Sequence, residues 1–486
     1  MRRSVCFGLG LLLTAFLPLA ALGAEAEKSM ELSLEEAVRT ALTNNLGIMI
    51  RKDDVDAATG ARLAAEGEFD ILATGEAGAA GQEYAPLVSG AAAEEETGQW
   101  KIGLQKKFVT GTEVSLFWQN SRFSSTPQVY LIDPAYSSSL TLGIRQPLLR
   151  GFGSEIQTAG IRAADRNLAA SDLLVQSEAA NLAAGVRRAY WNLVYAWQDR
   201  EVKVLSIKLA EKLLDETRAK IEAGRLAEVD RYQPESEVAR REENLILADR
   251  SIGLYEDELK LLMNARDWQA PLKPTDLPQT APVQPDEAEV LDRALQQRPD
   301  VRAADLSREA AEILESAALD DTRPDLALVG LVGQGGTDEE YGSSLDDAID
   351  NPETQWQAGL ALSVPLQNRG AEGNYTQARA ATSKARNSAQ LLRLEVQRSV
   401  RTTLRDVQLA LKAMEATKKT SLASQKRLEA EQAKFDAGRA TTLDVLTAQE
   451  AYSEALSQEK LAEVSYAVAL AELDRIQGLT GLAAAP

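Results

Sequence analysis

Histidine is absent from this sequence of 486 residues, and cysteine occurs once, at Cys6. The absence of histidine excludes histidine general bases, histidine zinc ligands and the usual catalytic triads. The net charge of −20 argues against nucleic acid as a partner, because nucleic acid requires a basic surface. The sequence also lacks a nucleophile motif, a phosphate-binding glycine loop and metal-ligand spacing. We therefore expect no enzyme activity, no cofactor and no bound metal.

Long apolar runs are also absent, except at the N-terminus. Two arginines precede the apolar residues 5–22, and small residues follow them, which is typical of a signal peptide over residues 1–26. A membrane anchor is the alternative, but Pro18 interrupts the run and acidic rather than basic residues come after it. Cys6 lies within this segment. We expect an exported mature chain that has no thiol and no disulfide.

The remaining chain consists of two copies of one plan. The first copy, residues 27–264, begins with LSLEEAVRTALTNN, and the second, residues 286–486, begins with AEVLDRALQQRPDVRA. In each copy a helix leads to a glycine-rich stretch with strands, and a proline-free run of about seventy residues follows. A proline-rich linker, residues 265–285, separates the copies. We predict two repeats of the same supersecondary structure.

Each long helical run ends in the same kind of turn. The stretches IEAGRLAEVDRYQPE and FDAGRATTLDVLTAQ contain Gly224 and Gly438, each followed by arginine and then by residues that restart a helix. Seventy helical residues reach roughly 100 Å. Several apolar lines along these helices favour packing in the wall of a tube. A long antiparallel coiled coil is the alternative, which helix periodicity alone does not exclude.

Alternating strands distinguish these alternatives. Apolar and polar or small residues alternate in WKIGLQKKFV, TEVSLFWQN, SSLTLGIRQP and WQAGLALSV, and several tryptophans are placed where an interfacial girdle would lie. One chain offers only four to six such strands. A closed barrel needs about eight, and an open sheet edge is not tolerated in lipid. The strands therefore predict a barrel shared between copies of the chain, in contact with membrane lipid.

The segments LSLEEAVRTALTNN, QPLLRGFG, AYWNLVYA, IEAGRLAEVD, VPLQNRG and FDAGRATTLDVLTAQEAYSEA occur in this order. With them the chain resembles the TolC-type outer-membrane efflux family over nearly its whole mature length. The resemblance implies a mainly α-helical homotrimer with a shared β-barrel in the outer membrane of a Gram-negative bacterium. We take about twelve strands per trimer, four from each chain. A hairpin around Thr110 and Gly111 would raise the number to six per chain.

The resemblance further implies a passive export channel with a gated periplasmic end, continued below the barrel by a long α-helical tunnel. Its expected partners are a periplasmic adaptor protein and an inner-membrane transporter of the resistance-nodulation-division or ABC type. Its cargo would be drugs, small molecules or secreted proteins. The alternative is a periplasmic structural coiled-coil protein without transport activity. Such a protein would need neither the alternating strands nor a membrane.

The two glycine turns are where the family meets its adaptor. This function transfers here to Gly224, Arg225 and Leu226 in one turn, and to Gly438, Arg439 and Ala440 in the other. A plain helical corner would explain the glycines but not the repeated Gly-Arg pair. We expect six such turns around the tunnel mouth of a trimer.

The family's narrowest point lies just beyond these turns. Asp444 matches an aspartate of the family that points into the tunnel, so three copies would form a ring of carboxylates that attracts cations. Repulsion between the three like charges would raise the pKa of these carboxyl groups. A solvated surface aspartate, or a capping partner of Thr441, is the alternative. Thr447 stands where the family often has a second acid, and Phe435 where its gate often has tyrosine. Asp230 is the counterpart of Asp444 in the other hairpin.

The last assignments concern the other end of the helices. Pro147 and Pro365 stand where strand passes into helix, which suits residues that lack an amide hydrogen. The resemblance makes them the junction of barrel and tunnel. Two acidic, glycine-rich segments, residues 85–99 and 333–354, are predicted to be extracellular loops.

Overall fold

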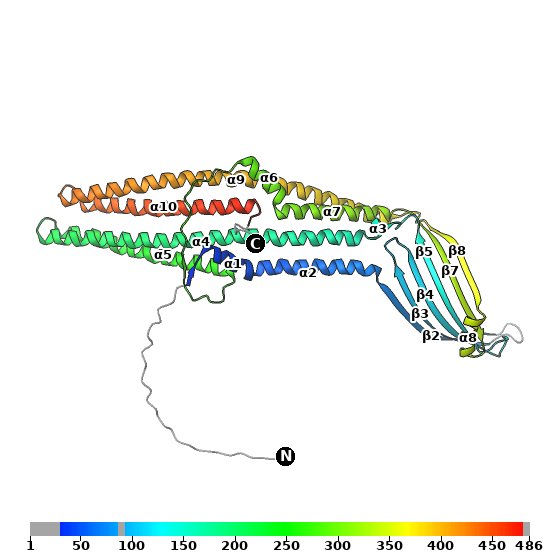
Figure 1. Cartoon of the computed structure of the whole chain (residues 1–486). Coiled ribbons are helices and arrows are strands. Elements are labelled where there is room, and N and C mark those ends of the chain that lie inside the picture. Colours follow the sequence, from blue (N-terminus) through cyan, green and yellow to red (C-terminus); the bar gives the residue numbers. More distant parts are fainter. Residues whose placement is uncertain (1–29, 86–92, 480–486) are drawn as a thin grey trace, which may run out of the picture.

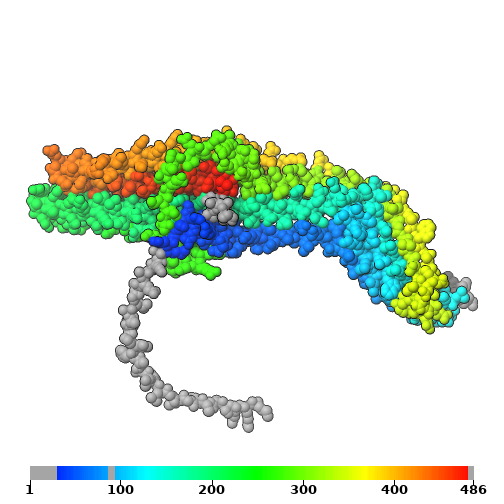
Figure 2. Space-filling model, in the orientation of Figure 1, coloured from blue at the N-terminus to red at the C-terminus, as the bar shows by residue number. Residues whose placement is uncertain are grey.

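The computed structural model describes residues 30–85 and 93–479. The predicted signal peptide, residues 1–26, lies outside the described residues. The molecule is a long rod of helices with a β-sheet at one end (Figure 1). The two halves of the chain run side by side along the rod, and in Figure 2 the blue-to-green half and the yellow-to-red half lie along one another.

Two very long helices run along the rod. They are α4 (Ala159–Glu222) with 64 residues and α9 (Arg369–Asp436) with 68 residues, close to the predicted seventy. Each extends about 100 Å at the usual helical rise. Each turns back into a shorter helix, α5 (Tyr232–Met263) after α4 and α10 (Thr442–Ile476) after α9. The chain is therefore mainly helical, as predicted.

Shorter helices extend the line of each hairpin toward the sheet. In space, the helices α1 (Leu34–Asn44) and α2 (Leu46–Glu66) lie next to the end of α5 and continue its line (Figure 1). The Asn45 side chain, between them, donates a hydrogen bond to the Leu262 carbonyl at 2.8 Å. Helix α2 packs along α4. Four lines of helix thus build the rod, two of them in pieces.

In the second half, too, two short helices come before the strands and a long helical hairpin comes after them, but this half contributes two strands to the sheet where the first contributes four. In space, the helices α6 (Glu287–Gln297) and α7 (Pro299–Asp320) lie beyond the end of α10, toward the sheet (Figure 1). Arg293 of α6 donates a hydrogen bond to the Gln477 side chain at the end of α10, at 2.7 Å. Helix α7 packs between α4 and α9.

In the described residues no helix is both long enough and apolar enough to cross a membrane.

The proline-rich linker is held against the middle of the rod. Its strand β6 (Leu272–Pro274) pairs in parallel with β1 (Met30–Leu32). The Tyr190 hydroxyl donates to Asp276 at 2.8 Å and accepts its backbone amide. The Tyr466 hydroxyl donates to the Ala281 carbonyl at 3.0 Å. Burial is the main cause that raises the pKa of Tyr190 to about 12, so this hydroxyl stays protonated and able to donate.

The sheet has six strands in the order β2-β3-β4-β5-β7-β8, and all neighbours are antiparallel. Their bounds are β2 (Ile71–Glu83), β3 (Glu94–Lys107), β4 (Glu113–Thr126), β5 (Ala135–Pro147), β7 (Asp325–Asp338) and β8 (Glu353–Ser363). The expectation of four strands per chain, and hence of about twelve per trimer, is therefore wrong. The hairpin at Thr110 and Gly111 does enter the sheet as β3 and β4, and Gly111 has a left-handed φ of 87°.

The two faces of the sheet differ in the way the alternation predicts. One face, called here the apolar face, carries side chains that are exposed in the single chain. They include Ile102, Leu104, Leu116, Trp118, Leu140, Ile144, Val332, Trp356 and Leu360. The opposite face, called here the polar face, carries residues such as Ser115, Thr141, Gln355 and Gln357. The apolar face has no covering layer over most of its described area.

The prediction of two loops at the far end of the sheet is wrong in part. Strand β3 already begins at Glu94, inside the first of these segments. In the second, β7 continues to Asp338, a helix α8 (Tyr341–Asp350) follows, and β8 begins at Glu353. Strand pairing and packing of α8 on β7 and β5 therefore order residues whose composition is typical of loops.

Candidate functional site

The two helical turns at the tip of the rod have the same geometry. Gly224 has φ 69° and Gly438 has φ 74°, both left-handed. The amide of the residue after each glycine donates to the carbonyl five residues earlier: Arg225 to Lys220, and Arg439 to Lys434, both at 2.8 Å. This is the pattern with which a glycine ends a helix. The predicted conformation of both glycines is confirmed.

The space around these glycines is open. A Cβ atom added to Gly224 or Gly438 would meet no atom within 4 Å. A side chain at these positions would therefore meet no steric clash, and its only cost would be the left-handed backbone conformation, about 1–2 kcal/mol for an ordinary residue. Arg225 and Arg439 are exposed, while Leu226 and Ala440 are partly buried. The tip thus presents two exposed arginines on turns of equal shape, suited to contact with another surface.

Asp444 takes part in the start of α10. Its Oδ2 accepts from the Thr441 amide at 2.8 Å and from the Thr441 hydroxyl at 2.7 Å, and the hydroxyl in turn accepts the Asp444 amide at 3.2 Å. This reciprocal pair is a capping box. The hydroxyl first, and the amide second, lower the pKa of Asp444 in the single chain. The carboxylate is exposed, on the same helix face as Thr447.

Asp230 occupies the equivalent place in the first hairpin. Its Oδ2 accepts from the Ala227 amide at 3.0 Å, three residues earlier, as Asp444 does from Thr441. In the described part of the chain it forms no ion pair with Arg225 or Arg439. Both aspartates are therefore placed by the same local bond at the beginning of the returning helix.

Phe435 is buried, with 2% of its surface exposed. It packs with Leu213, Val445 and Leu446, where the two hairpins meet near the tip. The Lys220 ammonium lies 3.3 Å from its ring centroid and donates to its carbonyl at 2.8 Å. The ring therefore joins α4 to α9 through a cation–π contact.

A further connection between the hairpins was not predicted from the sequence. Arg241 of α5 is 3% exposed and donates to the Ser206 carbonyl of α4 at 2.7 Å and to Gln449 of α10 at 2.9 Å. Its Nε donates to Glu237 at 2.9 Å. Next to it, Arg240 bonds Glu450 of α10 at 2.9 Å. The only sequence signal was the charged run at the start of α5, which is also typical of a solvated face.

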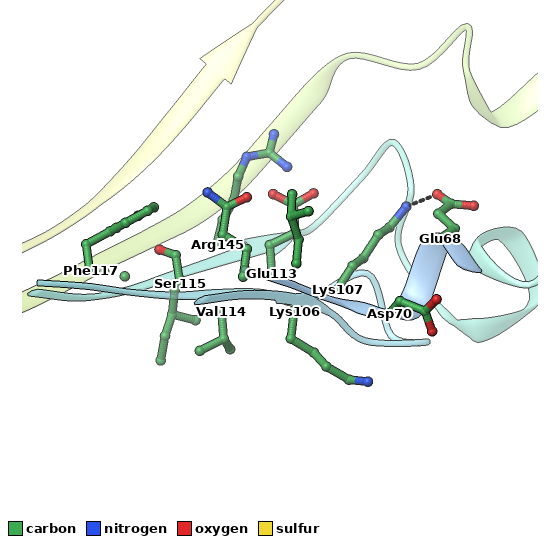
Figure 3. Close-up of a pocket in the computed structure, with 14 residues that line it drawn as sticks. Glu68, Asp70, Lys106, Lys107, Glu113, Val114, Ser115, Phe117 and Arg145 are labelled. Atoms are coloured by element: carbon green, nitrogen blue, oxygen red, sulfur yellow. Dashed lines mark hydrogen bonds and ion pairs between the residues drawn. The ribbon is translucent and has the colours of Figure 1, made fainter. Parts of the chain in front are cut away.

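The foot of the sheet, where strands pass into helices, is hollowed on its polar face. Figure 3 shows Lys107, Glu113 and Arg145 on one side of the strands, and Lys106 and Val114 on the other. The hollow has a volume of about 500 Å³. Cross-strand pairing places the first three side chains in one row. The polar face is therefore lined here by charges of both signs.

The two prolines lie at this same junction. Pro147 is the last residue of β5, and Pro365 follows β8 by two residues, four residues before α9 begins. Arg145 donates to both oxygens of Asp325 at 2.9 and 2.8 Å, which ties the foot of β5 to the start of β7.

Across residues 30–85 and 93–479, no group of three or more acidic side chains is arranged to hold a metal ion.

Comparisons with known proteins agree with this architecture. Residues 290–479 match the family model described as outer membrane efflux protein. No curated protein sequence matches the chain. The outer-membrane channel OprN aligns with a TM-score of 0.69 at 18% identity, covering 92% of this chain and 89% of that one.

Two further solved structures have the same fold. The outer membrane protein VceC of Vibrio cholerae aligns with a TM-score of 0.68 at 17% identity, covering 92% of this chain and 96% of that one. The MtrE outer membrane channel of Neisseria gonorrhoeae, in its open state, aligns with a TM-score of 0.62 at 19% identity, covering 92% of this chain and 89% of that one. Identities this low establish the fold alone, and the family model adds a match in sequence over residues 290–479. The resemblance to TolC-type channels is thus confirmed.

Proposed function

We propose that the protein is the outer-membrane channel of a tripartite export system, because residues 290–479 match the outer membrane efflux protein family model and 92% of the chain aligns with the fold of such a channel. It is a passive conduit for drugs, small molecules or secreted proteins. The observation that carries this proposal is the open six-stranded sheet, whose apolar face is exposed and whose two edge strands have no partner among residues 30–85 and 93–479.

Those edges argue for assembly. Strands β2 and β8 have 13 and 11 residues, and within the described part of the chain each has one unpaired edge. An unpaired edge is not tolerated in lipid. If β8 of one copy pairs with β2 of the next, the sheet closes without edges. Three copies, the number that the family resemblance implies, would give 18 strands, that is three times the six of one chain. The apolar face then meets lipid, and the polar face lines the conduit.

The rod continues the conduit below the sheet. Its helices extend about 100 Å from the sheet to the tip, which suits a tunnel through the periplasm of a Gram-negative cell. The two outer lines of the rod, α2 with α5 on one side and α9 on the other, would meet in neighbouring copies. A periplasmic coiled-coil protein, the rival function, offers no reason for a sheet with an exposed apolar face.

The tip is where partners would bind. Gly224, Arg225 and Leu226, with Gly438, Arg439 and Ala440, are proposed to meet a periplasmic adaptor that is coupled to an inner-membrane transporter of the resistance-nodulation-division or ABC type. Three copies would present six turns and six exposed arginines. The identical backbone geometry of the two turns supports docking of a repeated partner surface.

The gate is proposed to lie just inside this tip. Exposed Asp444 and Thr447 share one face of α10, so three copies would place three carboxylates around the axis. Asp230 and buried Phe435 hold the adjoining turn and hairpin contact in place. At the other end, Pro147 and Pro365 would mark the passage from barrel to tunnel.

The first test is electron microscopy of the mature protein extracted from outer membranes in mild detergent. Hollow three-fold cylinders with a tail of about 100 Å are expected. Solid single rods, or protein found only in the soluble periplasmic fraction, would refute the shared conduit.

The second test addresses the tip. The double variant Gly224→Asp and Gly438→Asp keeps a residue that tolerates left-handed backbone but adds an acid beside each arginine. We expect loss of export, measured as ethidium accumulation in the native host, with assembly unchanged. Gly160→Asp with Gly185→Asp, at open positions of α4 away from the tip and from the outer lines of the rod, is the matched control. Normal export by the tip variant would refute docking there.

A further inference from the structure

Helix α8 lies directly on the outer end of the sheet. A Cβ atom on Gly336 would stand 2.5 Å from the Ala348 amide nitrogen and 2.7 Å from the Ser344 carbonyl oxygen, so only glycine allows the helix to approach β7 this closely. Ser344 is fully buried and its hydroxyl lies 3.0 Å from that of Ser138 on β5. These contacts fix α8 to two strands, at the end of the sheet farthest from the helical rod (Figure 1).

The strand register shows that α8 covers the apolar face. Gly336 pairs with Ser138, and Ser138 with Asn120, which forms one row across the sheet. The next row toward the rod on the same face contains Trp118 and Leu140. On β4, β5 and β7 the apolar face therefore changes to small and polar residues in the row where α8 begins to cover it. Alternation of side chains puts this row on the face opposite to the conduit lining.

The helix itself has two unlike sides. Leu345 and Ala348 are partly buried toward the sheet, and Ile349 is 73% exposed beside them. Asp346 and Asp350 are exposed. A short helix with an apolar edge and an acidic edge is suited to the boundary between lipid chains and water.

A crevice of about 220 Å³ opens between this helix and the sheet. Trp118 and Leu140 line it from β4 and β5, and Leu345, Ala348 and Ile349 line it from α8. Trp118 and Leu140 remain 41% and 42% exposed in the single chain. The crevice thus continues the exposed apolar face under the edge of the helix.

We propose that this crevice holds one acyl chain of a lipid of the surrounding bilayer, and that α8 is an interfacial helix that fixes the depth of the sheet in the membrane. The proposal depends on the membrane position given under "Proposed function". Transported cargo does not fit this place, because the crevice opens on the face opposite to the conduit lining. A neighbouring copy does not reach it either, since copies would meet at β2 and β8, whereas the crevice lies over β4, β5 and β7.

The test uses photocrosslinking from within the crevice. The full-length assembly is reconstituted in vesicles of phosphatidylethanolamine and phosphatidylglycerol, with photoreactive benzoylphenylalanine at Leu345. A second sample carries it at Leu104, on the open apolar face, and a third at Asp346, on the acidic side of α8. After irradiation, mass spectrometry of the protein detects lipid adducts. We expect adducts at Leu345 and Leu104, and at least tenfold fewer at Asp346.

Two variants separate the crevice from ordinary lipid contact. Ala348→Phe fills the space, and Ile349→Glu places a charge at its exposed mouth without altering the packed side of α8. Each should lower the adduct at Leu345 at least fivefold and leave the adduct at Leu104 unchanged. An adduct at Leu345 that neither variant lowers would overturn the crevice as a lipid site. No adduct at Leu345 with a normal one at Leu104 would do the same, while failure at Leu104 would refute the membrane position itself.

Discussion

Replacing Arg241 with methionine tests whether a buried charge joins the two hairpins. The guanidinium is 3% exposed and bonds α4, α5 and α10 at once, through the Ser206 carbonyl, Glu237 and Gln449. Methionine keeps much of the apolar stem and removes all three hydrogen bonds. No other described contact of comparable burial links α5 directly with α10 by a charge.

The expected loss can be bounded from these contacts. Removing one partner of a buried ion pair typically costs about 3–5 kcal/mol, because the other charge remains desolvated. Glu237 keeps two bonds from Arg240, at 2.9 and 2.8 Å, so its charge is not left alone. We therefore expect the lower end of the range, about 3 kcal/mol of unfolding free energy. Arg240→Met is the matched control: its side chain is 48% exposed, and we expect at most about 1 kcal/mol.

The assay is unfolding of the detergent-solubilised assembly, followed by circular dichroism at the helical band in urea. The Arg241→Met variant should unfold at clearly lower urea than the Arg240→Met variant. Equal shifts for the two variants would refute the view that burial makes Arg241 important. An unchanged midpoint for Arg241→Met would show that the connection adds nothing.

The same network has a defined pH dependence. Desolvation raises the pKa of Glu237, but hydrogen bonds from Arg240 and Arg241 outweigh it, so the pKa is lowered overall. A lowered folded-state pKa means that the stabilisation is complete above the unfolded pKa of a glutamate, about 4.3, and is lost as pH falls through the folded value. The wild-type protein should lose stability in this acid range more steeply than Arg241→Met. Parallel pH profiles would contradict this.

Three other predictions concern separate parts of the molecule. Asp444→Asn should reduce cation selectivity in a planar bilayer, and an unchanged reversal potential under a salt gradient would remove this carboxylate from the lumen. Tyr466→Phe leaves the Val283 amide and Ala281 carbonyl of the linker without their partner, so the melting temperature should fall, by an unfolding cost of about 1–3 kcal/mol; an unchanged melting temperature would refute the clamp. Leu116→Lys, on the apolar face, should impair membrane insertion by about 2–4 kcal/mol, whereas Ser115→Lys on the polar face should not. Equal insertion of the two lysine variants would contradict the assignment of the faces.

Much of the helical part could be predicted from the sequence because its signals are local. Gly224 and Gly438 end long proline-free runs and are followed by residues that begin a helix. Only the six residues around each glycine are needed to form its turn, and the structure shows these bonds. Strand alternation around Trp118 and Trp356 likewise separated the two faces of the sheet correctly.

The number of strands could not be predicted in the same way. Strand β2 has the sequence ILATGEAGAAGQE, whose outward positions include Ala73, Gly75 and Ala77, so alternation of large apolar residues is absent. Its pairing with β3 over thirteen residue pairs defines it as a strand. Helix α8 was missed for a related reason, since its place depends on Gly336 of a neighbouring strand rather than on its own acidic sequence.

Contacts between distant parts of the sequence were also beyond local patterns. Arg241 meets Gln449 across 208 positions, and the Tyr466 hydroxyl meets the Val283 amide across 183. Neither tyrosine nor arginine stands out in a helix of mixed composition. Such partners are fixed only when the hairpins are packed, so sequence periodicity does not reveal them.

The proposed place of Asp444 in the gate would give one side chain a structural role and a role in transport. In the single chain its Oδ2 accepts both bonds from Thr441, and these lower its pKa, whereas three carboxylates on one axis would raise it. Among the described residues its Oδ1 has no hydrogen-bond partner and is available to a cation. Asparagine keeps an oxygen that can accept from Thr441, and it replaces the second oxygen and the charge by a neutral NH2 group. The start of α10 should therefore survive Asp444→Asn, which makes a change in selectivity attributable to the charge and not to a frayed helix.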